Sequence, residues 1–600
     1  MTKRWHRCDF CTPELEEEKK VTSLLFDIET DSLEPEMIHC LVTMDCDTGE
    51  IRRYNHENEG NFYNGLKALQ EADVIIGHNI IGFDLIAIRE LYPEWTTRAE
   101  IRDTLIYSRL LWPHLRELDH QKHWGKNIEV TPGSHSLEAW GLRMGFEKWT
   151  DVTEDKSIFE RWSKELEDYC TRDVEVTWRL WQEIQYKEPT EASVALEHKF
   201  TVLMEDMSRH GFLFDRREAD KLYVRLAKRQ NDHECELEEA FPPKTIERFS
   251  EKTGRRLKDR IEVFNPGSRK QIAERLQEQG WEPQEFTPDG RPKVSETILN
   301  DLGGCIPEAL VLMDYLLTQK KIGQLAEGKN SLLGLAGRDD RVHGRVIANG
   351  TVSGRCAHHT PNMANVPADE EFRSLFIVPE DYHLVGCDAS GLELRCLAHY
   401  MHPWDNGAYA RQILEGDIHT QNMEAAGLTD RSQAKTLIYA LIYGAGDAKL
   451  GEIVDGGMKE GRALRKRFLD RTPALKKLTE AVKYKAKNER HLIGLDGRKL
   501  HCRSQHSALN LLLQSAGALL MKTATCLLSD RLARQQLYKP RDWALVAHVH
   551  DEVQIECLDC ISDIVAESAV WSIEEAGEAF SFQIPLAAES RIGKNWWETH

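Results

Sequence analysis

Residues 384–400 read LVGCDASGLELRCLAHY, and residues 547–556 read AHVHDEVQIE. The first stretch predicts a strand, a tight Ala-Ser-Gly turn and a helix, with Asp388 at the end of the strand. The second predicts two strands joined by a turn that holds Asp551 and Glu552. A hairpin tip in a sheet can bring Asp551 beside Asp388, so these carboxylates are expected to meet.

Carboxylates that converge in this way can hold divalent cations. Metal ions at such a site would bridge a triphosphate and a 3′ hydroxyl, lower the pKa of the hydroxyl and neutralise the pyrophosphate. The alternative is an ordinary polar turn, which is the commoner role of an isolated His-Asp-Glu.

A helix is expected over residues 431–443, with Thr429 as N-cap and Gly444 as its stop. Two cations and two aromatic residues follow one another at i, i+4 spacing and therefore share one face. This face suits a nucleoside triphosphate, because cations bind phosphates and rings pack against sugar and base. An amphipathic surface helix is the alternative. The four residues are Arg431, Lys435, Tyr439 and Tyr443.

A second acidic set lies in the N-terminal third of the chain. In LLFDIET the alternation of a buried strand places Asp27 and Glu29 on one side. Asp84 follows a second apolar strand, and Tyr169 and Asp173 lie four apart on a helix. Together the acids could bind two divalent metals that activate a water and stabilise a leaving 3′ oxygen, with the tyrosine orienting the water.

Composition and charge limit the classes of protein. The chain has 600 residues and a net charge of −21, yet residues 459–503 hold 15 Lys or Arg against 5 Asp or Glu. This basic stripe suits a protein that binds phosphates in a cleft, and a solvated helical face is the alternative. We expect a cytoplasmic protein, because no apolar run approaches the ~20 residues of a membrane span, no signal segment opens the chain, and its 14 cysteines form no framework.

The order of the motifs resembles two known families. Asp-x-Glu, then Asn-x4-Asp, then Tyr-x3-Asp resembles the 3′→5′ proofreading exonucleases of the DEDD type, in their tyrosine variant. The C-terminal motifs resemble the family A DNA polymerases, in particular the replicative enzymes of short-tailed (T-seven-like) bacteriophages. The matching runs are HSLEAWGLRMG (135–145), FNPGSRKQIAERL (264–276), RVHGRVIANGTVSGRCAHHTPNMANVP (341–367), VGCDASGLELRCLAHY (385–400), EGDIHT (415–420), AKTLIYALIYGAG (434–446), GLDGRKLHCRS (494–504), ALNLLLQSAGAL (508–519) and HVHDEVQIE (548–556).

The resemblance implies a role for each matching residue. The polymerase metal ligands would be Asp388 and Asp551 with support from Glu552, and the exonuclease ligands would be Asp27, Glu29, Asp84 and Asp173. Two Mg²⁺ are implied at each site, and Mn²⁺ can substitute. Arg431, Lys435 and His419 would bind the triphosphate, Tyr443 would stack at the nascent pair, Glu393 would exclude a 2′ hydroxyl, and Tyr439 is the variant that accepts dideoxynucleotides. Arg355, Asn510, Gln514 and His550 would touch primer or template.

The resemblance also implies the architecture: a multidomain α/β and α+β chain in which an RNase H-like exonuclease domain precedes a right-hand polymerase domain. The expected parts are an N-terminal extension (1–20), the exonuclease domain (21–187), the thumb region (188–335), the first part of the palm (336–415), the fingers (416–490) and the second part of the palm (491–600). Cys8 and Cys11 in the extension have C-x-x-C spacing, but no second pair completes a zinc site.

The resemblance names partners as well. Primer-template DNA and dNTPs are expected, together with replisome proteins such as a helicase-primase and a single-strand binding protein, and no membrane. Capture of thioredoxin is not expected, because the stretch 241–264 is short where the phage relatives carry a long insert. The competing hypotheses are a single-subunit RNA polymerase and a nuclease or DNA-binding protein with a defunct polymerase half.

Overall fold

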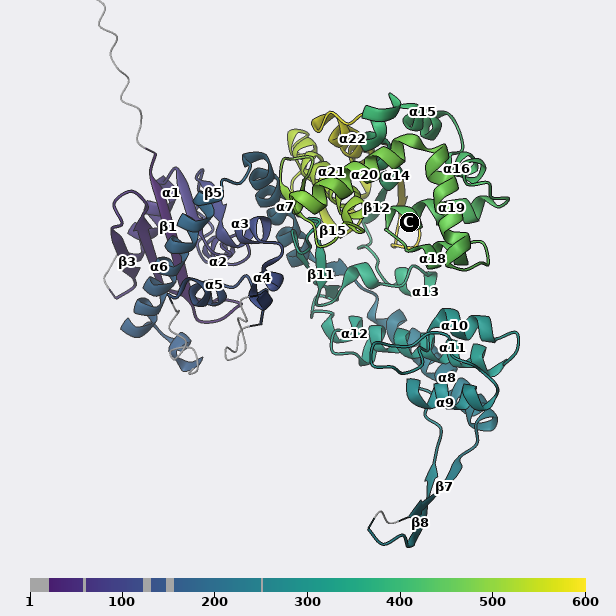
Figure 1. The fold of residues 1–600 in the computed structure, drawn as a ribbon. Coiled ribbons are helices and arrows are strands. Elements are labelled where there is room, and N and C mark those ends of the chain that lie inside the picture. Colours follow the sequence, from purple (N-terminus) through teal and green to yellow (C-terminus); the bar gives the residue numbers. More distant parts are fainter. Residues whose placement is uncertain (1–20, 58–60, 122–130, 147–155, 250–251) are drawn as a thin grey trace, which may run out of the picture. The chain divides into compact units, whose positions relative to one another are not determined.

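The computed structural model describes residues 21–57, 61–121, 131–146, 156–249 and 252–600 (Figure 1). Cys8 and Cys11 lie outside the described residues. The chain divides into two compact units. The first comprises residues up to Val202 together with Asp496–His501, and the second comprises Leu203–Leu495 and Cys502–His600. The division into palm, fingers and thumb stays a prediction.

The first unit is built on a mixed five-stranded sheet with the order β3-β2-β1-β4-β5. The central strand β1 pairs antiparallel with β2 and parallel with β4. The strands are β1 (Ser23–Thr30), β2 (Ile38–Asp45), β3 (Ile51–Asn55), β4 (Val74–Gly77) and β5 (Glu100–Asp103). Mixed pairing of this kind confirms the expected α/β unit.

Helices cover both faces of this sheet. Leu25 packs in one buried cluster with Cys170 and Val174 of α6, whereas Phe26 and Ile28 belong to a second cluster on the opposite face. The alternation of β1 therefore turns Asp27 and Glu29 toward the α6 face. The helices are α1 (Asn61–Glu71), α2 (Asp84–Leu91), α3 (Thr104–Leu111), α4 (Leu115–Gln121), α5 (Leu137–Met144), α6 (Lys164–Tyr186) and α7 (Glu191–His210).

A late segment of the chain completes the first unit. Arg498, between β13 (His491–Ile493) and β14 (Lys499–His501), forms ion pairs with Glu197 and Asp496 at 2.7 Å each. All three side chains are buried. Removing one partner of such a buried pair leaves an uncompensated charge, so the three residues fix this segment on α7.

The second unit contains an antiparallel four-stranded sheet with the order β15-β16-β12-β17. Helix α22 (Ser562–Ala579) packs on β12 and β17, and α21 (Ala508–Arg534) packs against α22. Large buried rings, among them Phe212, Phe376 and Trp596, fill the core beside the sheet. The strands are β12 (Tyr382–Ala389), β15 (Trp543–Val549), β16 (Glu552–Leu558) and β17 (Ala588–Gly593).

Helices make up most of the rest of the second unit. A helical group with its own buried cluster contains α8 (Arg216–Ala240), α9 (Arg269–Glu278), α10 (Glu296–Leu302) and α11 (Glu308–Ile322). Further helices are α12 (Leu332–Leu335), α13 (Glu370–Arg373), α14 (Leu392–Asp405), α15 (Ala408–Glu415), α16 (Ile418–Ala426), α17 (Arg431–Ile442), α18 (Asp447–Glu452), α19 (Met458–Arg471) and α20 (Pro473–Asn488). Between α8 and α9 the chain forms a hairpin of β7 (Lys244–Phe249) and β8 (Arg256–Glu262).

The predicted N-cap of α17 was wrong by one residue. The side chain of Asp430, not Thr429, accepts hydrogen bonds from the backbone amides of Ser432 and Gln433. An aspartate satisfies two free amides of the first turn and its charge suits the positive end of the helix. The helix ends at Ile442, one residue before the predicted end.

Candidate active sites

The sheet of the second unit brings together the acids of its two defining motifs. Asp388 on β12 lies directly opposite Glu552 on β16, and the amide of Ala389 donates to the carbonyl oxygen of Asp551 at 3.0 Å. The turn that carries Asp551 requires His550 to adopt a left-handed conformation, with φ of +57°. Histidine tolerates this region better than a β-branched residue would.

Crowding of negative charge is the main electrostatic feature of this edge. Partial burial, followed by the nearby carboxylates of Asp551, Glu552 and Glu589, raises the pKa of Asp388 to about 7. Burial also raises the pKa of Asp551, and Glu393 adds to the effect. Acids whose ionised forms are mutually unfavourable become compatible when a cation lies between them, so these residues fit a divalent metal.

Glu552 is held by protein contacts. Its carboxylate accepts hydrogen bonds from Trp596 Nε1 and from Gln554 Nε2, the latter at 2.7 Å. It also lies 3.0 Å from His600 Nδ1 and 3.7 Å from Arg373 Nη1. With both oxygens committed to these partners, Glu552 is placed to fix the end of the sheet beside Asp388 and Asp551.

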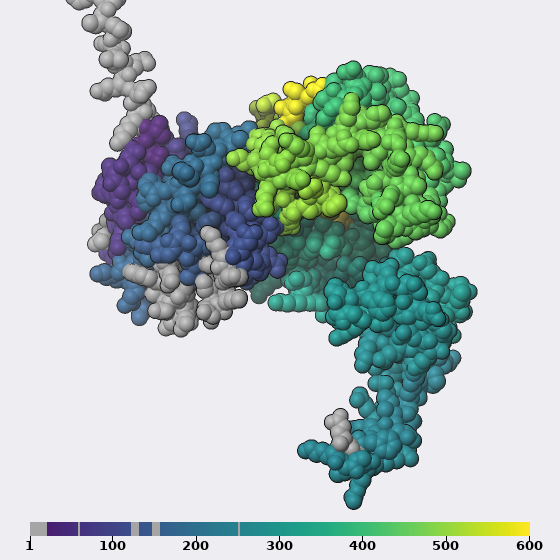
Figure 2. All heavy atoms as spheres, in the orientation of Figure 1, coloured from purple at the N-terminus to yellow at the C-terminus, as the bar shows by residue number. Residues whose placement is uncertain are grey.

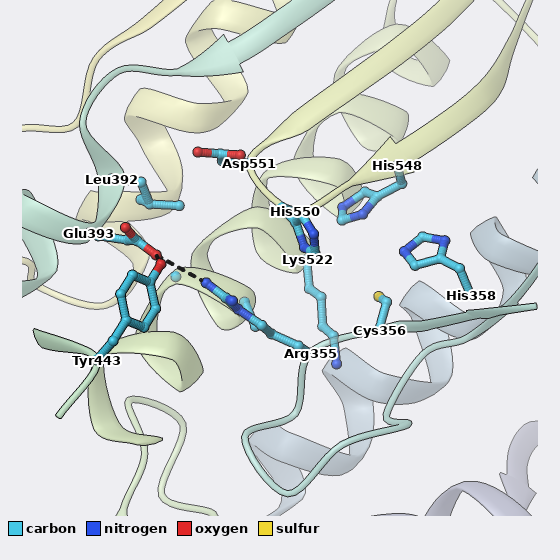
Figure 3. Close-up of a pocket in the computed structure, with 12 residues that line it drawn as sticks. Arg355, Cys356, His358, Leu392, Glu393, Tyr443, Lys522, His548, His550 and Asp551 are labelled. Carbon is cyan, nitrogen blue, oxygen red and sulfur yellow. Dashed lines mark hydrogen bonds and ion pairs between the residues drawn. The ribbon is translucent and has the colours of Figure 1, made fainter. Parts of the chain in front are cut away.

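A cavity of about 330 Å³ opens beside Asp551 (Figure 3). Glu393, in the first turn of α14, accepts hydrogen bonds from the hydroxyl of Tyr443 and, at 3.4 Å, from Arg355 Nη2. Figure 3 draws the contact with Arg355 as a dashed line and shows the hydroxyl of Tyr443 beside the Glu393 carboxylate. Five predicted residues thus line one cavity: Arg355, Glu393, Tyr443, His550 and Asp551.

The helix α17 displays its cations to solvent. Arg431 forms a bidentate pair with Asp417, the N-cap of α16, and this pair lowers the pKa of Asp417. His419 follows in the first turn of α16, and its ring lies 6.4 Å from that of Tyr439. Three predicted nucleotide contacts therefore lie side by side, and Lys435 is exposed on the same helix. Asp417, the carboxylate partner of Arg431, was not predicted.

One stripe of α21 carries the two predicted DNA contacts. Asn510 and Gln514 lie one turn apart, and continuing at the same spacing gives Ala518 and Lys522, which line the cavity next to Asp551. Oδ1 of Asn510 is buried and has no hydrogen-bond partner among the residues that the structure describes.

Among the residues of this cavity that sequence reasoning missed, Lys522 and His548 are both ionisable and buried. Lys522 is buried and follows from the i, i+4 extension of the Asn510 stripe. His548 is also buried, and burial lowers its pKa to about 3. It lies two residues before His550 on β15, but its burial depends on helix packing that no local pattern reveals.

The first unit gathers the second acidic set. Ligand atoms of Asp27, Glu29 and Cys170 lie within 4.8 Å of one another, and the Cys170 thiol lies 3.5 Å from Asp27 Oδ2. Cys170 was not predicted, although it stands between Tyr169 and Asp173 on the turn of α6 that faces β1. Both of those residues are buried.

Asp84 joins this set from the start of α2. Its Oδ1 accepts a hydrogen bond from the amide of Ile28 at 3.3 Å, which places it against β1. Burial, followed by the carboxylates of Asp103 and Asp173, raises the pKa of Asp84 to about 7. Asp103, also missed, accepts hydrogen bonds from the amides of Asn79, Ile81 and Leu105 and so supports the loop before Asp84. This acidic cluster likewise fits a divalent metal.

Comparison with known proteins identifies the chain. Residues 243–598 match the family model described as DNA polymerase family A. The DNA-directed DNA polymerases of Enterobacteria phage T3 and Escherichia phage T7 are 34% and 33% identical, and each match covers 96% of this chain and 100% of the relative. The chain belongs to DNA polymerase family A. It is a DNA-directed DNA polymerase of the phage type, and enzymes of this family use divalent metal ions.

More distant family A relatives match part of the chain. The DNA polymerase I of Aquifex aeolicus is 28% identical over 59% of this chain and 62% of its own length. A solved structure described as the POL domain of Pol1 from M. smegmatis in complex with DNA primer-template and dNTP has a TM-score of 0.76. Its sequence identity is 17%, with 96% of each chain covered, so it supports the fold of the polymerase.

The long helix α21 contains a long apolar stretch. Among the described residues it is the one helix long and apolar enough to cross a membrane, so the expectation that no apolar run approaches that length was wrong. Most of its apolar stretch is buried in the structure, as in the core helix of a soluble protein.

Proposed function

We propose that this family A polymerase copies a bacteriophage genome by adding dNTPs to a primer 3′ hydroxyl and removes misincorporated nucleotides with a 3′→5′ exonuclease site in the same chain. One observation carries the proposal. Two separate groups of acids, far apart in sequence within each group, converge on two different sheets.

In the joining site, Asp388 and Asp551 would hold the metals, and Glu552 would keep the two strands in register. Two Mg²⁺ at each site, or Mn²⁺ in their place, would supply charge neutralisation and a lowered pKa of the attacking hydroxyl or water. The raised pKa values of Asp388 and Asp84 support these metal sites, because nearby acids that disfavour each other's ionised forms would be stabilised by a cation between them.

The nucleotide would bind along α17. Arg431 would release Asp417 and bind the triphosphate instead. A carboxylate and a phosphate can each accept two parallel hydrogen bonds from one guanidinium group. Lys435 and His419 would bind the same phosphates, and Tyr443 would stack at the nascent base pair. Tyr439, which lies between Lys435 and Tyr443 along the chain, is the residue expected to allow incorporation of dideoxynucleotides.

Selection for deoxyribose would rest on Glu393. Its hydrogen bonds to Tyr443 and Arg355 hold its side chain at the cavity wall beside Asp551. A carboxylate fixed there would occupy the space that a 2′ hydroxyl needs.

The primer-template would run past α21 and the β15–β16 turn. Arg355, Asn510, Gln514 and His550 would contact it, and the buried Oδ1 of Asn510 could accept a hydrogen bond from the amino group of a guanine, the donor that base pairs present in the minor groove.

In the trimming site, Asp27, Glu29, Asp84 and Asp173 would hold the metals, and Tyr169 would orient the attacking water. Convergence of these side chains from β1, α2 and α6 supports the assignment.

The organisation and partners follow from this function. The domain limits stay those predicted: 1–20, 21–187, 188–335, 336–415, 416–490 and 491–600. We infer action in the host cytoplasm with a helicase-primase and a single-strand binding protein, and without thioredoxin.

Primer assays test the proposal against its rivals. The purified chain, Mg²⁺ and a primed template should give extension with dNTPs, little with rNTPs, shortening of the primer without nucleotides, and neither reaction with EDTA. Extension by rNTPs would support an RNA polymerase instead. Shortening without extension would support a nuclease with a defunct polymerase half.

A further inference from the structure

A series of hydrogen bonds in the first unit leads from α7 to the acidic cluster of the trimming site. It passes from His198 on α7 to Asp103 at the end of β5, and from there to the loop before Asp84. His198 and Asp103 are only 8% and 2% exposed, so the series is shielded from water. In Figure 2 side-chain atoms fill the spaces that the ribbon of Figure 1 leaves between the sheet and the helices of this unit.

The first step is the contact of His198 with β5. β5 is the last strand of the sheet, so an amide on its outer edge needs a partner from outside the sheet. Nε2 of His198 accepts a hydrogen bond from the amide of Asp103 at 2.8 Å, and Nδ1 lies 2.8 Å from the carbonyl oxygen of Val194. Because a carbonyl oxygen only accepts, the proton is on Nδ1 and the lone pair of Nε2 faces β5. Burial lowers the pKa of His198, which keeps the ring in this neutral form.

The second step is the contact of Asp103 with the loop before α2. Its carboxylate oxygens accept hydrogen bonds from the amides of Asn79 and Ile81, at 2.8 and 3.0 Å. Asn79 has a φ of +66°, a left-handed conformation that a residue other than glycine keeps only when its surroundings hold it. The carbonyl oxygen of Ile80 in turn accepts a hydrogen bond from the amide of Leu85. The Asp103 carboxylate therefore determines where the first turn of α2 lies.

The third step is the metal ligand itself. Asp84 is the first residue of α2, and its Oδ1 accepts a hydrogen bond from the amide of Ile28 at 3.3 Å. A shift of the loop would move Asp84 relative to Asp27 and Glu29, which belong to β1. Metal affinity depends on the positions of all the ligand oxygens, so the residues that hold a ligand in place affect it as well.

Other contacts hold α7 in place on its side of the series. Glu197, the neighbour of His198, forms a buried ion pair with Arg498 at 2.7 Å. The ring of His198 lies 5.2 Å from the ring of Tyr107 on α3. Since these contacts fix the helix and the imidazole, loss of the hydrogen bond to Asp103 should loosen the loop before Asp84 rather than α7.

We propose that His198 is a positioning residue of the trimming site, which acts through Asp103 to place the metal ligand Asp84. The inference rests on the proposed 3′→5′ exonuclease function. It extends the working parts of the trimming site beyond residues 21–187 to α7. His198 has no part in extension, which depends on acids of the second unit.

The test compares full-length variants with the unaltered enzyme. His198→Leu removes the acceptor, whereas His198→Gln keeps an oxygen at about the reach of Nε2. Val194→Ala shortens a buried side chain one turn earlier on the same helix and leaves the acceptor in place, so it controls for lost packing. Asp103→Asn weakens the series one step closer to Asp84, and it serves in place of His198→Leu if that variant does not fold.

Trimming of a single-stranded primer is measured against Mg²⁺ concentration, below the melting temperature of every variant. His198→Leu should raise the half-saturating Mg²⁺ concentration about tenfold and leave extension within about twofold of the parent, because outer residues of metal sites have effects of this size on affinity. His198→Gln should recover most of the affinity. Val194→Ala should melt at a lower temperature and keep the parental Mg²⁺ requirement.

Mn²⁺ binding provides a readout that does not depend on activity. The variants are also made in a background of Asp388→Asn with Asp551→Asn, which leaves the trimming site as the proposed metal site. Electron paramagnetic resonance of free Mn²⁺ should then show binding weakened by His198→Leu by a factor similar to that seen in trimming.

Parental Mg²⁺ dependence and parental Mn²⁺ binding in folded His198→Leu would overturn the positioning role while the unaltered enzyme still trims. An equal effect of Val194→Ala would also overturn it, because general loosening of α7 would then explain the change. If the unaltered enzyme extends primers and does not trim them, the exonuclease function fails and the positioning role fails with it.

Discussion

Replacing Asp84 by asparagine should stabilise the metal-free fold. Burial beside Asp103 and Asp173 raises the pKa of Asp84 to about 7, against ~3.9 for an unfolded aspartate. An acid with a raised pKa costs stability as the pH rises from about 4 to about 7, because the unfolded state ionises first. Three pKa units correspond to about 4 kcal/mol at pH 8. Asparagine keeps the shape, and its Oδ1 can still accept the hydrogen bond from Ile28.

The assay is hydrogen exchange of the β1 and α6 amides in EDTA. It reports opening of these elements even though a chain of two units need not unfold in one step. Asp84→Asn should slow exchange at pH 8, by up to the equivalent of about 4 kcal/mol, and the gain should vanish near pH 4 to 5. Glu71→Gln removes an equal charge from an exposed position and should change little. Equal or faster exchange at pH 8 in Asp84→Asn would refute the reasoning.

Four further predictions concern the second unit. Tyr439→Phe should raise discrimination against dideoxynucleotides; an unchanged termination pattern in sequencing ladders would speak against the role. Glu393→Ala should increase rNTP incorporation at least tenfold, a change of about 1.4 kcal/mol, in single-turnover kinetics; no change would remove the sugar gate. Asp417→Asn should lower the KM for dNTPs by freeing Arg431, and a higher KM would contradict that exchange. Burial lowers the pKa of His548 to about 3 in the folded protein, so below pH 6.5 the free energy of unfolding should fall by about 1.4 kcal/mol per pH unit as the unfolded state takes up a proton. Urea titrations of His548→Gln should show a smaller loss of stability with falling pH, and equal losses in both proteins would exclude His548 as the cause.

Much of both acidic clusters could be predicted because local geometry determines it. Strand alternation places Asp27 and Glu29 on one side, and a two-residue turn fixes Asp551 at a hairpin tip. The pairing of Asp388 with Glu552 also requires β12 and β16 to be neighbours in the sheet. Periodicity alone does not predict which strands are neighbours, so that prediction also needed the resemblance of the motifs to a known family.

Other features depended on information that no local pattern holds. Thr429 and Asp430 can both cap a helix, and only the backbone conformation selects one. The ion pair of Arg431 with Asp417 requires α16 and α17 to pack side by side. The hairpin between α8 and α9 is exposed on both faces, so it lacks the alternation that predicts a strand.

The most direct test of two independent acidic sites measures extension and trimming side by side on one primed template. Asp388→Asn should abolish extension and keep trimming. The double variant Asp27→Asn with Glu29→Gln should abolish trimming and keep extension at the parental rate. Loss of both activities in either folded variant, or survival of extension in Asp388→Asn, would contradict the account.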